Sequence, residues 1–97
     1  MYLKIHRTPA GDEIVAVCDR ELLNARIVHG DLEIHISEAF YGGNLATPEE
    51  VRKALSNAAN ANLMGARTVA LAVEMGLITK NGCIKIGSTP HAQIIRI

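Results

Sequence analysis

The chain has 97 residues, of which 48% are hydrophobic and 21% charged, so it can form one small globular domain and is too apolar to be disordered throughout. Ten basic and ten acidic residues leave no net charge, which removes the usual electrostatic argument for a polyanionic partner without excluding RNA. Aromatic residues make up only 3%, so the core must consist mainly of aliphatic side chains.

The first third of the sequence predicts strands. Leu3 and Ile5 alternate with polar residues, a period of two that is typical of a strand with one solvent-exposed face. Proline and glycine in residues 8–12 predict a turn, and the apolar run over residues 13–18 predicts an interior strand. We expect a short helical turn within residues 20–26 and a further strand over residues 31–37, where apolar and polar residues alternate.

The middle of the sequence predicts two helices. The first begins with Thr47 as the N-cap, Pro48 at the first helical position and Glu50 three residues after the cap. A second helix is expected to begin among the asparagines of residues 57–62, and Gly76 is expected to end it in a left-handed conformation. Its apolar stripe is predicted from residues three and four apart, namely Leu63, Ala66, Ala70, Val73 and Leu77.

The tail predicts two strands, residues 83–86 and 93–97, joined by a loop over residues 87–92. Runs of strands beside a pair of helices indicate an α+β fold. We therefore expect a single α+β domain over residues 1–97. It should contain a mainly antiparallel sheet of about five strands with a helical pair packed on one face.

The aromatic and glycine residues Phe40, Tyr41, Gly42 and Gly43 form the first candidate binding segment. Two rings beside a flexible backbone can stack on a base or receive a peptide. Alternatively, Phe40 fills the core where the third strand leaves the sheet, and the glycines make the turn.

A second candidate is the expected start of the second helix, where Asn60 and Asn62 precede Arg67. This helix start has no acidic residue in its first turn and could hold an anion. The alternative is an amide-capped joint between two helices, because asparagine is a strong N-cap.

The third candidate is the segment around His91 and Gln93, which is expected to be a loop entering the last strand. Histidine can carry protons near neutral pH, and glutamine can contact a base edge. Alternatively, both side chains satisfy backbone groups in a rigid turn.

No established catalytic, cofactor-binding or metal-binding motif is present, so we expect no cofactor and no metal. His6, His35 and Cys83 would form a metal site only if their strands were adjacent. Cys18 is a poor candidate nucleophile, because an apolar strand and the neighbouring Asp19 should both raise the pKa of its thiol.

The opening of the chain lacks the apolar stretch of a signal peptide, and no segment reaches the roughly 20 apolar residues of a membrane span. Two cysteines are too few for a disulfide framework. We therefore expect a cytoplasmic location with reduced thiols and no membrane partner.

Four segments carry a resemblance to a known family: the opening MYLKIHRTPAGDEIVAVCDREL, then SEAFYGG, ANANLMG and the terminal GSTPHAQIIRI. Together they resemble the small archaeal proteins grouped as domain of unknown function 424, and PHAQ is the most specific piece. The resemblance extends over nearly the full length. It implies an archaeal cytoplasmic protein and supplies no activity or catalytic residues.

Two functions remain open. The first is a non-catalytic module that binds RNA or a ribonucleoprotein through Phe40, Tyr41, Asn60/Asn62, Arg67, His91 and Gln93. The second is a small-molecule enzyme or ligand-binding protein with a pocket between residues 40–43 and His91, completed where necessary by homo-oligomerisation. In both cases we expect Tyr41, His91 and Gln93 to share one surface.

Overall fold

The computed structural model describes residues 1–95 of the chain. The elements run as follows: β1 (Tyr2–Arg7), β2 (Glu13–Cys18), the 3₁₀ turn η1 (Arg20–Leu22), β3 (Arg26–His29), β4 (Leu32–His35), α1 (Glu38–Tyr41), β5 (Asn44–Leu45), α2 (Pro48–Ser56), β6 (Asn60–Met64), α3 (Ala66–Glu74), the 3₁₀ turn η2 (Lys80–Gly82), β7 (Ile84–Ile86) and β8 (Thr89–Ile95).

The fold is α+β, and the main sheet has six strands in the order β5-β1-β2-β6-β8-β7. All neighbouring strands are antiparallel except β2 and β6, which run parallel. The expectation of about five strands was therefore too low, and it missed the parallel pair. The additional strands β3 and β4 form a separate two-stranded hairpin.

The expected turn and interior strand near the N-terminus are confirmed. The Thr8 N–H donates to the Asp12 carbonyl at 2.8 Å and closes the turn between β1 and β2. The interior position of β2 follows from its residues, because apolar side chains on both faces need cover on both sides. The expected helical turn after β2 is η1.

Helix α2 begins where the sequence predicts. The Thr47 side chain accepts the Glu50 N–H at 3.2 Å, and the Glu50 carboxylate accepts the Thr47 N–H at 3.1 Å. This capping box satisfies two N–H groups that lack partners within the helix. Val51 and Leu55, four residues apart on this helix, are fully buried.

The predicted start of the second helix was wrong, because residues 60–64 form the central strand β6. Ala61 and Leu63 are buried and alternate with the half-buried Asn60 and Asn62, a period of two that is typical of a strand rather than a helix. Helix α3 begins only after Gly65. The φ of 111° at this glycine turns the backbone between β6 and α3. The predicted stripe was only partly right: Val73 and Leu77 pack against the core, but Ala66 and Ala70 are exposed. The buried α3 residues are Thr68, Val69, Leu71 and Ala72.

The predicted end of α3 at Gly76 is confirmed. Gly76 has a φ of 75°, and its N–H donates to the Val73 carbonyl at 2.9 Å. The Leu77 N–H donates to the Ala72 carbonyl at 3.0 Å. These two bonds form a Schellman motif, which satisfies carbonyls at the helix end.

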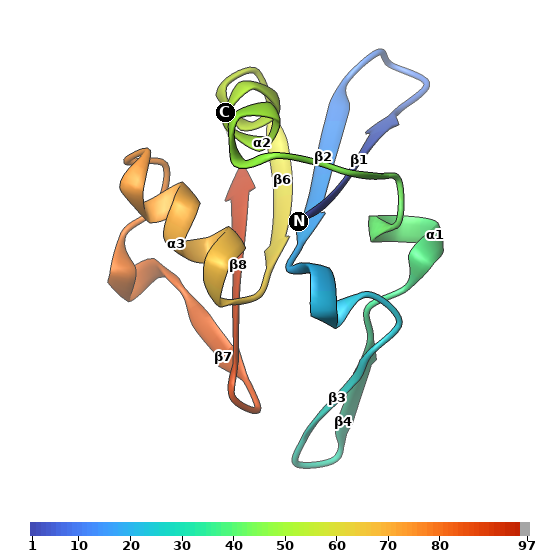
Figure 1. Cartoon of the computed structure of the whole chain (residues 1–97), viewed down its shortest axis with the longest axis vertical. Helices are drawn as coiled ribbons and strands as arrows, with labels where there is room; N and C mark the ends of the chain where they lie inside the picture. Colours follow the sequence, from blue (N-terminus) through green and yellow to red (C-terminus); the bar gives the residue numbers. More distant parts are fainter. Residues whose placement is uncertain (96–97) are drawn as a thin grey trace.

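Helices α2 and α3 pack on the same side of the main sheet, here called the helix face (Figure 1). The larger core lies between these helices and the sheet. Its central sheet residues are Val15, Val17, Ala61, Leu63, Ala92 and Ile94.

The other side of the sheet, here called the hairpin face, is covered by α1 and the β3–β4 hairpin over part of its area (Figure 1). A second apolar cluster lies there. It includes Ala16, Cys18, Ile36, Tyr41, Met64 and Ile86. The hairpin also reaches β7, because the Gly87 N–H donates to Nδ1 of His29 at 3.0 Å.

The C-terminal strands differ in their limits from the prediction. The expected loop over residues 87–92 is confined to a turn before Thr89, and His91 and Gln93 lie within β8 rather than in a loop. The Pro90 carbonyl accepts the Gly65 N–H at 2.8 Å, which fixes β8 to the end of β6. Residues 96–97 of the predicted last strand lie outside the described residues.

Among the described residues, none of the helices has the length and apolar character that crossing a membrane requires.

Candidate functional site

Strand register arranges the side chains of the hairpin face in three rows across the sheet. Neighbouring strands are about 4.8 Å apart, so side chains in one row are direct neighbours. The first row is His6, Ile14, Asn60 and Ile95; the second is Lys4, Ala16, Asn62 and Gln93; the third is Tyr2, Cys18, Met64, His91 and Ile84.

Helix α1 covers the β1 and β2 part of these rows. Ser37 caps this helix by accepting the Phe40 N–H at 3.2 Å. Nζ of Lys4 donates to the Ala39 carbonyl at 2.7 Å, and Nε2 of His6 lies 2.8 Å from the Phe40 carbonyl. These bonds hold α1 against β1.

The two aromatic residues of α1 have different environments. Tyr41 is 7% exposed and packs in the core with Cys18 and Met64, so Tyr41 rather than Phe40 fills the core here. Phe40 is half-buried and stacks on His6 with ring centroids 4.8 Å apart and planes at 18°. Gly42 and Gly43 follow, packed too closely against Glu38 and the β1 backbone to carry a side chain.

The β6 and β8 part of the hairpin face carries three carboxamides, Asn60, Asn62 and Gln93, here called the amide patch. The two asparagines are half-buried and Gln93 is exposed. Nε2 of Gln93 donates to Oδ1 of Asn62 at 2.9 Å. Whichever way the two amides are turned, this pair keeps one donor group and one acceptor free for a ligand.

His91 lies in the third row, beside the amide patch. Its Nδ1 is 2.9 Å from the Leu63 carbonyl, so Nδ1–H donates to this oxygen. Met64 is its register partner and also packs with Tyr41. Tyr41, His91 and Gln93 therefore lie on the same face of the sheet, although burial of Tyr41 prevents its ring from acting as an open platform.

Arg67 does not join this surface. It lies at the start of α3 on the helix face, where Nη1 donates to Oε2 of Glu21 at 3.0 Å. At this helix start the protein itself supplies a carboxylate. Asp19 is 3% exposed and its carboxylate accepts the backbone N–H groups of Arg67 and Thr68 at 3.0 and 2.8 Å.

Sequence reasoning missed this role of Asp19. Its carboxylate also accepts the Thr68 hydroxyl at 2.8 Å, and the absence of a side chain at Gly65 leaves room for it. A local signal was present, because an acidic residue directly after an apolar strand is unusual inside a core. Its partner, Thr68, lies far along the chain, so the sequence alone could not identify this contact.

The expected effect on the Cys18 thiol is confirmed. Burial, followed by the charge of Asp19, raises the pKa of Cys18 from 9.0 to about 11. Burial and the adjacent Cys18 raise the pKa of Tyr41 from 10.0 to about 12. Both groups are therefore neutral at physiological pH and are unsuited to nucleophilic attack.

The candidate metal ligands lie apart. His6 is on β1, His35 is on the separate hairpin, and Cys83 packs with the core under the helices. Within residues 1–95, no three histidine, cysteine or acidic side chains are grouped so that they could hold a metal ion.

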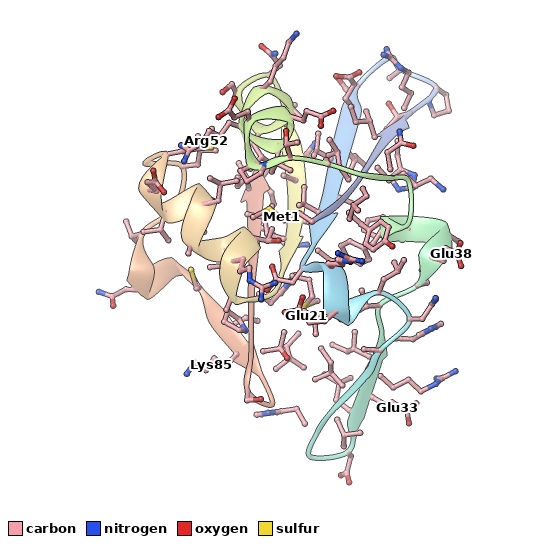
Figure 2. The ribbon with its side chains drawn as sticks, viewed as in Figure 1. Met1, Glu21, Glu33, Glu38, Arg52 and Lys85 are labelled. Carbon is pink, nitrogen blue, oxygen red and sulfur yellow. The ribbon has the colours of Figure 1, made fainter. Side chains whose placement is uncertain are left out.

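Charged side chains are distributed over the periphery rather than collected on one face. Figure 2 shows Glu33, Glu38 and Lys85 on the outer sides of three different elements, and Arg52 between α2 and α3. The described ion pairs are exposed: Arg7–Glu13, Arg26–Glu33, Arg52–Glu74 and Arg67–Glu21.

Both the sequence and the fold are similar to those of known proteins. Residues 6–97 match the model of the family described as Protein of unknown function (DUF424). The fold is similar to the crystal structure of an uncharacterized conserved protein from Methanopyrus kandleri, with 29% sequence identity and a TM-score of 0.80. That match covers 99% of this chain and 92% of the other. No curated protein matches the chain.

Proposed function

We propose that the chain, which belongs to the DUF424 family, is a non-catalytic cytoplasmic module that binds single-stranded RNA with the open half of its hairpin face. The single observation that carries this proposal is the amide patch on β6 and β8. Three carboxamides are grouped on an open part of the sheet, where two of them are hydrogen-bonded to each other.

Carboxamides suit base edges because they offer a donor and an acceptor side by side. Single-stranded RNA exposes its base edges, whereas the bases of a duplex are paired. The free donor and acceptor of the Asn62–Gln93 pair are therefore matched to a splayed base.

The stacked rings of Phe40 and His6 support the same proposal. His6 shares a row with Asn60 two strands away, which is a separation of about 10 Å. A ring at this border can stack on one base while the amide patch contacts another, since stacking tolerates any base.

The neutral character of the surface defines the mode of binding. Lys4 is the basic residue of the three rows, and it directs its ammonium group to the Ala39 carbonyl. Base contacts rather than phosphate contacts would then supply most of the affinity.

A small-molecule pocket between residues 40–43 and His91 receives less support. A hollow of about 200 Å³ lies beside His91 and Gln93, and another of about 350 Å³ lies beside Gly43. The two hollows have no lining residue in common, so they do not form one pocket.

The test is fluorescence anisotropy with labelled single-stranded oligomers of adenine, uracil and cytosine and with a duplex of the same length. Removing both amides in an Asn62→Ala/Gln93→Ala variant should weaken binding to the preferred oligomer by roughly 10- to 100-fold, from the usual value of base contacts. Asn57→Ala is the control, because it removes an exposed carboxamide near α2 on the helix face. Equal affinities of the double variant and the wild type, or no binding to any single strand, would reject the proposal.

A further inference from the structure

Strand β1 has an outer edge that is only partly paired. Its neighbour β5 pairs with Tyr2 and Leu3 and then leaves the sheet. Within residues 1–95, no strand pairs with the outer side of β1 from Ile5 to Arg7.

The direction of the backbone groups along this edge follows from one hydrogen bond. The Ala46 N–H donates to the Met1 carbonyl at 2.7 Å, so Met1 directs its backbone groups away from β2. Because directions alternate along an antiparallel strand, Ile5 and Arg7 direct their N–H and C=O groups to the same side. Past the end of β5, these four groups are available to a further strand.

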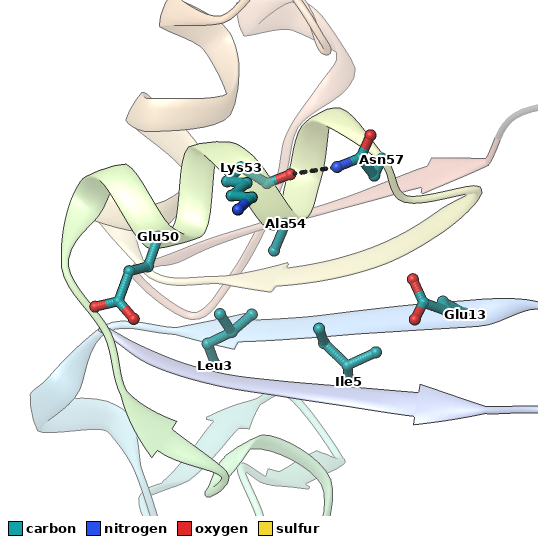
Figure 3. Close-up of a pocket in the computed structure, with 7 residues that line it drawn as sticks. All are labelled: Leu3, Ile5, Glu13, Glu50, Lys53, Ala54 and Asn57. Carbon is teal, nitrogen blue, oxygen red and sulfur yellow. Dashed lines mark hydrogen bonds between the residues drawn. The ribbon is translucent and has the colours of Figure 1, made fainter.

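A groove runs beside this edge on the helix face, between β1 and α2 (Figure 3). One part has a volume of about 400 Å³ and a mainly apolar floor of Leu3, Ile5 and Ala54. A second part of about 350 Å³ shares Leu3, Ile5 and Glu50 and extends to the edge at Gly43 and Asn44. Ile5 is 45% exposed, although it lies within a strand of the sheet.

The charged groups on the rim differ in whether they have partners. Glu13 is paired with Arg7 at 2.9 Å, and Glu50 accepts the Thr47 N–H at 3.1 Å. Lys53 is exposed, and none of the described residues forms an ion pair or hydrogen bond with its ammonium group. An acidic group on a ligand would therefore find its partner in Lys53.

We infer that the outer edge of β1 and the groove beside α2 form a strand-addition site for an extended peptide segment of a protein partner. The edge supplies backbone hydrogen bonds through Ile5 and Arg7. The groove receives apolar side chains at alternate positions of the peptide, and Lys53 selects an acidic residue. Backbone bonds give affinity and the groove gives specificity, as in other cases of β-strand addition.

A peptide fits this edge better than a second copy of the chain does. Two β1 strands paired about a twofold axis at His6 would place Pro9 of the partner copy opposite Leu3, where Asn44 is already paired. Moving the axis to Arg7 avoids that collision but sets two arginines directly opposite each other, which is unfavourable. A peptide can end before β5.

This site is separate from the amide patch that carries the RNA proposal. It uses the outer edge of β1 and the helix face, whereas the amide patch lies on the hairpin face of β6 and β8. One surface can therefore fail its test without affecting the other.

The test begins with a library of random heptapeptides displayed on phage and selected on the folded wild-type protein. The enriched peptides should share apolar residues at alternate positions and an acidic residue. A synthetic enriched peptide with blocked ends should then slow hydrogen exchange of the Ile5 and Arg7 amides at least tenfold. The amides of Gln93 and Ile95 on β8 serve as the internal control.

Two matched pairs of reagents distinguish this site from other binding. Lys53→Glu should weaken the peptide about tenfold, whereas Lys85→Glu, an exposed charge on the far edge strand β7, should leave it unchanged. Methylating the peptide backbone nitrogen opposite Ile5 should abolish binding without any change in the protein. Failure to enrich peptides, full binding of the methylated peptide, or protection of Ile5 that depends on protein concentration alone would overturn the inference.

Discussion

The Asp19 carboxylate holds the first turn of α3 through Thr68, accepting both its backbone N–H and its hydroxyl at 2.8 Å. Asp19 is 3% exposed and Thr68 is fully buried, so water cannot replace these bonds. Asp19→Ala removes the helix cap and leaves buried donors without a partner. We expect a loss of about 2–4 kcal/mol in the free energy of unfolding, measured by urea denaturation.

The matched control for this change is Glu21→Ala. Glu21 is also acidic and bonds to Arg67 of the same helix turn, but both side chains are exposed. An exposed ion pair contributes about 0–1 kcal/mol. Equal losses in the two variants would show that Asp19 is not the cap of α3.

Gly65 and Gly76 allow the cost of positive φ to be separated from the cost of crowding. A Cβ atom added at Gly76 would have no other atom within 4 Å, so Gly76→Val or Gly76→Ala should cost about 1–2 kcal/mol from backbone strain alone. Gly65→Ala meets the same kind of strain and also collides with the Asp19 carboxyl group. Gly65→Ala should therefore reduce the free energy of unfolding clearly more than Gly76→Ala does. Thermal denaturation measures both, and an unchanged melting temperature for Gly76→Val would contradict the assigned end of α3.

Alkaline pH should destabilise the fold through Cys18 and Tyr41. Their folded pKa values are raised from 9.0 to about 11 and from 10.0 to about 12, so the unfolded chain loses these protons first. The stabilising contribution is complete below about pH 9 and is lost as pH rises through 11 and 12. Between pH 8 and 10.5, the wild type should lose about 2–3 kcal/mol more in urea denaturation than a Cys18→Ala/Tyr41→Phe variant. Parallel losses in the two proteins would contradict this assignment.

The His29 side chain joins the β3–β4 hairpin to the turn after β7. Its Nδ1 accepts the Gly87 N–H at 3.0 Å. Hydrogen exchange at the Gly87 amide should therefore be faster in a His29→Ala variant than in the wild type at pH 7.5. His35→Ala, an exposed histidine on the same hairpin, should leave Gly87 protected.

If RNA is the ligand, its affinity should depend weakly on salt for a nucleic-acid binder. The chain has no net charge, and Lys4 in the candidate surface is engaged with the Ala39 carbonyl. Few phosphate contacts release few counterions, so the slope of log affinity against log salt should be shallow. Titrations at 50 and 200 mM salt measure it. A loss of about 10³-fold or more over that range would indicate many phosphate contacts and contradict base-directed binding.

Elements with local signals were predictable from the sequence. Thr47, Pro48 and Glu50 define the start of α2 within four positions, and Gly76 with Leu77 defines the end of α3. The α+β class followed from the order of such segments. Strand β6 was missed. The alternation within residues 60–63 is a strand signal, but it is short, its asparagines are also strong helix N-caps, and its parallel neighbour β2 lies far back in the sequence.

The candidate site was predictable only in part. His91 and Gln93 were selected as polar residues in an expected loop, whereas strand register places them beside Asn62 on an open sheet face. Arg67 was grouped with them because Asn60 and Asn62 were assigned to its helix. The groove beside β1 was missed, because an unpaired strand edge is a property of the sheet order and leaves no mark in β1 itself.

The parallel pairing of β2 with β6 also constrains when the chain can fold during synthesis. The β1–β2 hairpin can form early, but Val15 and Val17 have no cover until α2 and β6 have been made. Closing a contact between distant segments is entropically costly, so this step should be slow and should determine the folding rate. A nascent chain that stops before Asn60 would expose one side of its hairpin to aggregation, and productive folding must wait for the second half of the protein.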